Sequence, residues 1–126
     1  MADWQLELTD KYSRDHAHYE KKHPQELAAV LSNLDTYFKT LSAVGNPLQV
    51  TAGFIHRESD GIIAIDQKGG DRKIKLQQTR LYLFPDTPMT ILYALAIGDK
   101  TSQRDDINVC RTFVKKLKGG RDAKTI

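Results

Sequence analysis

The stretch "RKIKLQQTRLYLF", residues 72–84, decides how the second half of this chain is expected to fold. Apolar and cationic side chains alternate in it, with Ile74 between Lys73 and Lys75. Because successive side chains of a strand point to opposite faces, such a segment has one apolar and one cationic face. The pattern predicts a strand over residues 73–84 that is held to a core by its apolar residues and presents its cations on the other face.

Length and composition indicate one domain covering residues 1–126. A chain of 126 residues can bury about two-thirds of its unfolded surface. The single cysteine excludes an intramolecular disulfide and fits a reducing compartment. No apolar run approaches the ~20 residues of a membrane span, and "MADWQLELTD" lacks the features of a signal peptide. We therefore expect a cytoplasmic protein that does not enter a membrane.

The first half of the chain reads as a strand followed by two helices. "WQLEL", residues 4–8, alternates apolar and polar residues, as a half-buried strand does. Asp10 or Ser13 could cap a helix through residues 13–23. Pro24 suits the first turn of a second, amphipathic helix, which Gly45 and the following Asn-Pro would end. The two helices are expected to form a hairpin against the sheet.

The second half reads as three strands and a helix. "IIAID", residues 62–66, precedes the cationic strand, and "TILYALAIG", residues 90–98, is apolar on both faces, as in a central strand. A helix over residues 104–118 should end at Gly119-Gly120, with a flexible tail from about residue 119. The predicted fold class is α+β, with a small, mostly antiparallel sheet packed by helices.

Charge is divided unevenly along the chain. Residues 1–67 hold 6 Lys/Arg and 10 Asp/Glu, a net charge of −4, whereas residues 68–126 hold 13 Lys/Arg and 6 Asp/Glu, a net charge of +7. Cations gathered in one half favour a polyanionic partner for that half. The alternative is that these charges only solubilise exposed faces.

Other chemical signals are weak. Cys110 falls on the apolar stripe of the last helix, which is typical of a packed, unreactive thiol. His16, Glu20 and His23 lie within two helical turns, but His23 precedes a proline and no further ligand cluster appears. Neither Gly69-Gly70 nor Gly119-Gly120 has the spacing of a phosphate loop. We expect no metal and no cofactor.

Three segments of the second half of the chain resemble a known family. "KIKL", then "TRLYLF", and then "YALAIGDKTSQRDDI" leading into a last helix are similar to the RelE/HigB superfamily, the toxins of type II toxin–antitoxin systems. The resemblance covers residues 4 to about 117, with HigB-like members the most similar. It implies a RelE-like fold, a cognate antitoxin as partner, and an activity: cleavage of mRNA on the ribosome, without a metal, by attack of the RNA's own 2′-hydroxyl.

The resemblance also implies roles for individual residues. Lys73 and Lys75 match the family's "KIKL" lysines, Arg80 the strand arginine that stabilises charge on the phosphate, and Lys100 the basic residue after the last strand. RNA-binding residues are expected around these four: Lys68, Arg72, Tyr82 and Arg104. No Tyr or His follows Tyr93, so the family's C-terminal Tyr or His has no match; Tyr82 is the aromatic expected to stack on a base instead.

Three function classes stay open. The first is a ribosome-dependent mRNA interferase. The second is a toxin of the same fold that cuts no RNA and acts on another target, such as DNA gyrase. The third is a non-toxic nucleic-acid- or protein-binding module, in which Lys73 and Lys75 face solvent and Arg80 pairs with Asp66 or Asp99. The assembly could be a homodimer or a toxin–antitoxin hetero-oligomer.

Overall fold

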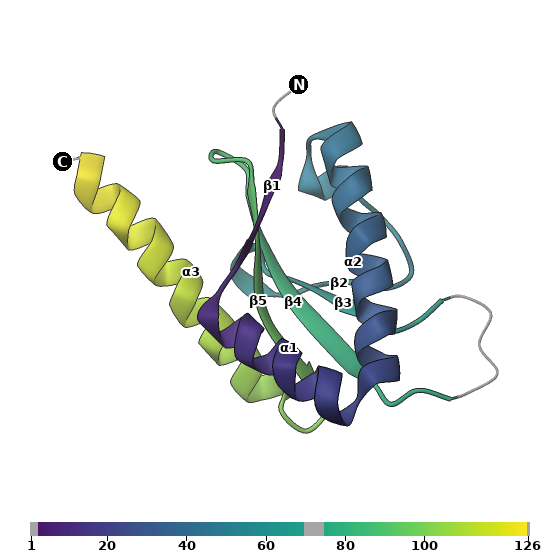
Figure 1. Cartoon of the computed structure of the whole chain (residues 1–126). Coiled ribbons are helices and arrows are strands. Elements are labelled where there is room, and N and C mark those ends of the chain that lie inside the picture. The colour runs from purple at the N-terminus through teal and green to yellow at the C-terminus, as the bar shows by residue number, and fades with distance from the viewer. Residues whose placement is uncertain (1–2, 70–74, 126) are drawn as a thin grey trace.

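The computed structural model describes residues 3–69 and 75–125, with side chains described as far as residue 120. The chain forms one five-stranded sheet with two helices on one face and one on the other (Figure 1). The elements are β1 (Gln5–Leu8), α1 (Asp10–Lys22), α2 (Pro24–Val44), η1 (Pro47–Gln49), β2 (Ile55–Arg57), η2 (Ser59–Gly61), β3 (Ile63–Asp66), β4 (Thr79–Asp86), β5 (Ile91–Asp99) and α3 (Gln103–Thr125). This is the predicted α+β class, with its N-terminal strand, helical hairpin, small sheet and C-terminal helix.

The sheet has the order β1-β5-β4-β3-β2. Only the β1–β5 pairing is parallel, and the other three are antiparallel. β5 lies between β1 and β4, so the expectation that the apolar 90–98 segment is not an edge strand is confirmed. The edge strand β2 was not predicted, because its three residues are too few to show a two-residue period.

The cationic strand is shorter than predicted. β4 begins at Thr79, where Thr79 pairs with Asp99 and Arg80 with Asp66, the last residues of the two neighbouring strands. Neither neighbour extends further, so residues 75–78 have no partner for a hydrogen-bond ladder. Lys75 therefore lies in a connecting segment and not on a strand, which corrects the sequence-based prediction. Arg72, Lys73 and Ile74 lie outside the described residues.

Side-chain alternation divides the buried residues into two clusters. The face covered by α1 and α2 holds the larger one, and Leu81 and Leu83 of β4 belong to it, as predicted. The face covered by α3 holds a smaller one, formed by Ile62, Ala64, Tyr82, Phe84, Leu95, Ala96, Cys110 and Val114. A sheet buried on both faces explains the nearly continuous apolar run of β5.

The helical hairpin begins and ends on specific local signals. The cap of α1 is Thr9, not Asp10 or Ser13: its Oγ1 accepts a hydrogen bond from Tyr12 N at 3.1 Å. Only His23 separates α1 from α2, and Pro24 occupies the first turn of α2 as predicted. Gly45 ends α2 with a φ of 78°, a left-handed conformation that a residue with a Cβ rarely adopts.

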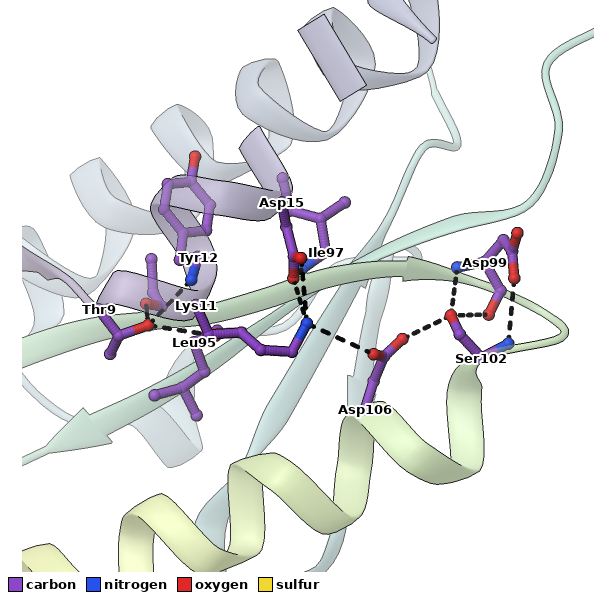
Figure 2. Close-up of polar contacts among 10 residues, drawn as sticks. Thr9, Lys11, Tyr12, Asp15, Leu95, Ile97, Asp99, Ser102 and Asp106 are labelled. Carbon is purple, nitrogen blue, oxygen red and sulfur yellow. Dashed lines mark hydrogen bonds and ion pairs between the residues drawn. The ribbon is translucent and has the colours of Figure 1, made fainter. Parts of the chain in front are cut away.

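α1 also completes the edge of β5, which is longer than its partner β1. Beyond Leu8, Thr9 Oγ1 donates to the carbonyl of Leu95 at 3.2 Å, and Asp15 Oδ2 accepts a hydrogen bond from Ile97 N at 3.0 Å (Figure 2). Two side chains thus replace the missing strand and satisfy backbone groups that a buried edge would leave unpaired. Lys11 Nζ forms an ion pair with Asp15 Oδ2 at 2.7 Å and lies 4.0 Å from Oδ1 of Asp106 on α3.

The first turn of α3 packs against the end of β5. Asp106 is 6% exposed, and its Oδ2 accepts a hydrogen bond from Ser102 Oγ at 2.7 Å. Burial raises the pKa of Asp106 above its ordinary value, whereas the hydroxyl of Thr101 lowers that of Asp99. α3 does not end at Gly119-Gly120 but continues to Thr125. Glycine within a helix costs only about 1 kcal/mol, so the expectation that Gly119-Gly120 would end the helix is wrong.

Cys110 is fully buried on α3, as the apolar stripe predicted. Burial raises the pKa of its thiol to about 12, so almost no thiolate is present at neutral pH. We expect no labelling of the folded protein by iodoacetamide within an hour at pH 7.5 and full labelling in 6 M guanidinium, measured by mass spectrometry. Rapid labelling of the folded chain would show that α3 leaves the sheet readily.

Candidate functional site

A cleft opens at the end of the sheet where β3 leaves and β4 enters. Its volume is about 340 Å³, and its lining consists of Asp66, Gln67, Lys68, Lys75, Leu76, Gln78 and Arg80. We call it the Arg80 cleft. Lys68 and Lys75 are exposed, whereas Arg80 is half-buried. Three of the predicted functional cations therefore share one concavity, although only Arg80 is on a strand.

Helix α2 fixes both ends of the segment that carries these lysines. The Asn33 side chain, buried at 8% exposure, donates to the carbonyl oxygens of Asp66 and Lys68, both at 2.8 Å. One face of the same helix also presents Glu26, whose carboxylate accepts a hydrogen bond from Gln77 N at 3.0 Å. Backbone contacts of this kind hold Lys68 and the end of the segment near Lys75 in place, while both lysine side chains are exposed.

Arg80 is tied to one carboxylate. Its Nη1 donates to Glu58 Oε1 at 3.3 Å, and the two side chains are 16% and 19% exposed. The partner is thus Glu58, not Asp66 or Asp99 as the sequence suggested. Arg80 Nε is buried and has no hydrogen-bond partner among the described residues. Glu58 engages one of the five N–H donors of the guanidinium, and Arg80 also lines the cleft, so a further acceptor such as a phosphate could bind there.

A histidine–carboxylate pair lies beside the arginine. His56 Nε2 is 2.6 Å from Asp66 Oδ2, with side-chain exposures of 30% and 3%. The other oxygen of Asp66 accepts a hydrogen bond from Lys68 N at 2.7 Å. Asp66 thus contacts both His56 on the edge strand β2 and the backbone of Lys68. It also lines the Arg80 cleft. We call His56, Glu58, Asp66 and Arg80 the His56 cluster.

The remaining predicted residues lie elsewhere. Lys100 is exposed in the turn after β5, and Arg104 is exposed in the first turn of α3, so neither lines the cleft. Tyr82 is 0% exposed on the face covered by α3, and its burial raises the pKa of the phenol. A base cannot stack on a ring buried in this way, which corrects that expectation. The predicted roles of Arg72 and Lys73 lie outside the described residues.

His56 and Glu58 escaped the sequence-based prediction, although one signal pointed toward them. Asp66 ends a wholly apolar run, and a carboxylate in such a place needs a partner when the sheet buries it. Nothing in the sequence said that the partner would be His56, because the strand that brings it there is only three residues long. Among residues 3–69 and 75–125, no group of three or more His, Cys, Asp or Glu side chains could hold a metal ion, and no helix could span a membrane.

Comparisons with known proteins gave one structural likeness. No protein-family model matches this chain, and no curated protein matches it. A chain of the toxin–antitoxin complex RelBE2 from Mycobacterium tuberculosis is similar in structure, with 20% sequence identity and a TM-score of 0.45. The alignment covers 79% of this chain and 94% of that chain. The function proposed below therefore rests on the residues of this chain.

Proposed function

We propose that this chain is the toxin of a type II toxin–antitoxin system and that it cleaves mRNA on the ribosome without a metal. The observation that carries the proposal is the Arg80 cleft, where Lys68, Lys75 and Arg80 meet. A phosphodiester in that cleft would meet two exposed lysine side chains and one half-buried guanidinium. Such a set is suited to bind RNA backbone and to stabilise the charge that grows on a phosphate during transfer.

The sequence pattern supports the finer parts of the proposal. "KIKL", "TRLYLF" and "IGDK" resemble the RelE/HigB toxins, which implies mRNA and the ribosome as targets and an antitoxin as the neutralising partner. The net charge of +7 on residues 68–126 favours an antitoxin segment with an acidic surface. Cleavage would take place in the cytoplasm, where translating ribosomes are found.

One contact favours a second candidate, a toxin-fold protein that does not cut RNA. Glu58 lies 3.3 Å from Arg80 and neutralises part of the charge that phosphoryl transfer would need. The ion pair of Arg80 with Glu58 could instead have a structural role, linking β4 to the residue that follows β2. The protein would then act on another target, such as DNA gyrase, or bind nucleic acid without cleaving it.

Primer extension on translating ribosomes separates these candidates. Purified protein added to a coupled translation reaction should produce new 5′ ends within the A-site codon, and none on the same mRNA without ribosomes. Expression should also arrest growth, and co-expression of the adjacent small gene should relieve the arrest. Growth arrest without mRNA cuts, together with altered plasmid supercoiling, would favour the gyrase alternative. Harmless overexpression would favour the binding module.

Lys75 offers a test of RNA contact in the cleft. Lys75→Ala should weaken binding of mRNA-programmed ribosomes and lower the slope of log K against log salt by about 1, because each phosphate contact releases about one counterion. The matched control is Lys39→Ala, since Lys39 pairs with Asp35 on an exposed part of α2 at 2.8 Å. Equal salt slopes for both variants and the unmodified protein would remove Lys75 from the RNA-binding surface.

A further inference from the structure

The register of the sheet brings His56 of β2 next to Asp66, which lines the Arg80 cleft, although His56 is not itself among the described residues that line it. His56 pairs with Ala64 and Asp66 pairs with Arg80, so alternation puts the side chains of His56, Asp66 and Arg80 on the same face. Side chains directly opposite on neighbouring strands lie about 5 Å apart at Cβ. The Asp66 carboxylate consequently stands between an imidazole and a guanidinium, and it also lines the Arg80 cleft.

The contact with Asp66 determines which nitrogen of His56 can accept a proton. Asp66 Oδ2 is 2.6 Å from Nε2, and Oδ1 is engaged by Lys68 N. An ionised carboxylate only accepts hydrogen bonds, so Nε2 must carry the hydrogen and Nδ1 holds the lone pair. Nδ1 has no hydrogen bond among the described residues, and the His56 side chain is 30% exposed. The base form is therefore both oriented and accessible.

We propose that His56 is the general base of the RNA cleavage and that Asp66 is its positioning residue; this rests on the ribonuclease function proposed above. His56 Nδ1 takes the proton of the RNA 2′-hydroxyl, and O2′ forms a bond to phosphorus. The bond from phosphorus to O5′ breaks, and O5′ takes a proton from water. The products are a 2′,3′-cyclic phosphate and a 5′-hydroxyl, and the proton on His56 returns to solvent.

The charges around His56 are consistent with this division of roles. Asp66 from β3 faces the imidazole directly, while Glu58 and Arg80 face each other at 3.3 Å in the same cluster. The Asp66 carboxylate stabilises the imidazolium that forms as the proton arrives. Arg80, which lines the cleft, remains for the phosphate oxygens.

His56→Gln tests the proposal, because the glutamine amide can still donate to Asp66 and keep β2 attached to β3. The expected result is a loss of at least ~100-fold in the single-turnover cleavage rate on mRNA-programmed ribosomes. The melting temperature should stay within a few degrees. Affinity for ribosomes whose A-site codon carries 2′-O-methyl groups, which cannot react, should not change. The matched control is His18→Gln on the exposed side of α1, which should cleave at the full rate.

The pH profile gives a readout that a structural role would not move. The unmodified protein should show a cleavage rate that rises with pH, as general-base catalysis requires, and His56→Gln should lose that dependence. Nitrogen NMR of the free protein should find the hydrogen on Nε2 of His56, as the 2.6 Å contact requires.

Four other results would contradict the general-base role, and one of them would also contradict the proposed function. If the unmodified protein cleaves and His56→Gln cleaves within threefold of it, with the same pH profile, the general-base role is wrong and the ribonuclease function stands. The role is also wrong if His56→Gln loses ribosome binding to the same extent as cleavage, or if the hydrogen is found on Nδ1. Absence of any cleavage by the unmodified protein overturns the proposed function, and the base role with it.

Discussion

Arg80→Ala should reduce cleavage of ribosome-bound mRNA by ~100–1,000-fold, the usual loss when one preorganised electrostatic contact to a transition state is removed. β4 holds Arg80 rigidly, because Leu81 and Leu83 anchor the strand on one face and Tyr82 anchors it on the other. The measurement is single-turnover primer extension. Arg80→Lys should recover only part of the rate, since an ammonium lacks the planar fork of the guanidinium.

The stability of the same variants separates a functional from a structural arginine. Arg80→Ala leaves Glu58 half-buried without its 3.3 Å partner, which should cost about 1–2 kcal/mol of unfolding free energy. The double variant with Glu58→Gln should recover most of that stability and none of the cleavage. If Arg80→Ala unfolds the protein while activity per folded molecule is unchanged, Arg80 is an ion-pair partner and the cleft has another use.

Among the glycines whose surroundings the structure describes, Gly98 is the one where substitution by alanine should destabilise the fold most. A Cβ on Gly98 would overlap the carboxylate of Asp106, which packs directly over this position. Both residues are fixed, Gly98 by pairing with Arg80 in the sheet and Asp106 by the hydrogen bond from Ser102 (Figure 2). Overpacking of a rigid contact costs about 1–3 kcal/mol, and the first turn of α3 would have to move. Urea denaturation measures the loss.

Two further variants control for glycine itself. Gly53→Ala is matched, because a Cβ there meets nothing within 4 Å; it should be neutral or slightly stabilising, by up to ~1 kcal/mol. Combining Gly98→Ala with Asp106→Ala removes the nearer of two obstacles, leaving the Oγ of Ser102, and should restore part of the lost stability. Equal effects of the two glycine substitutions would mean that backbone entropy, not the Asp106 contact, determines the result.

The local signals of the sequence were sufficient where a few neighbouring residues decide the outcome. Pro24 and Gly45 marked the ends of α2, and the apolar runs of β3 and β5 marked buried strands. Backbone sterics and hydrophobic periodicity act over one or two turns, so these elements can be predicted from neighbouring residues alone. The same rule failed at Gly119-Gly120, where a modest propensity cost did not stop α3.

Only the tertiary structure decided where β4 begins and what Arg80 touches. The alternation around Lys73 and Lys75 suits a strand, but a strand needs partners, and β3 and β5 end opposite Arg80 and Thr79. Lys75 therefore enters the cleft from a connecting segment, held through Gln77 by Glu26 of α2. The sequence by itself determined the three helices, the strands β1, β3 and β5, and the presence of Arg80 on a strand. The contacts of Arg80 with Glu58, and of His56 with Asp66, come from strand pairing between residues 10 to 22 positions apart, which no local pattern encodes.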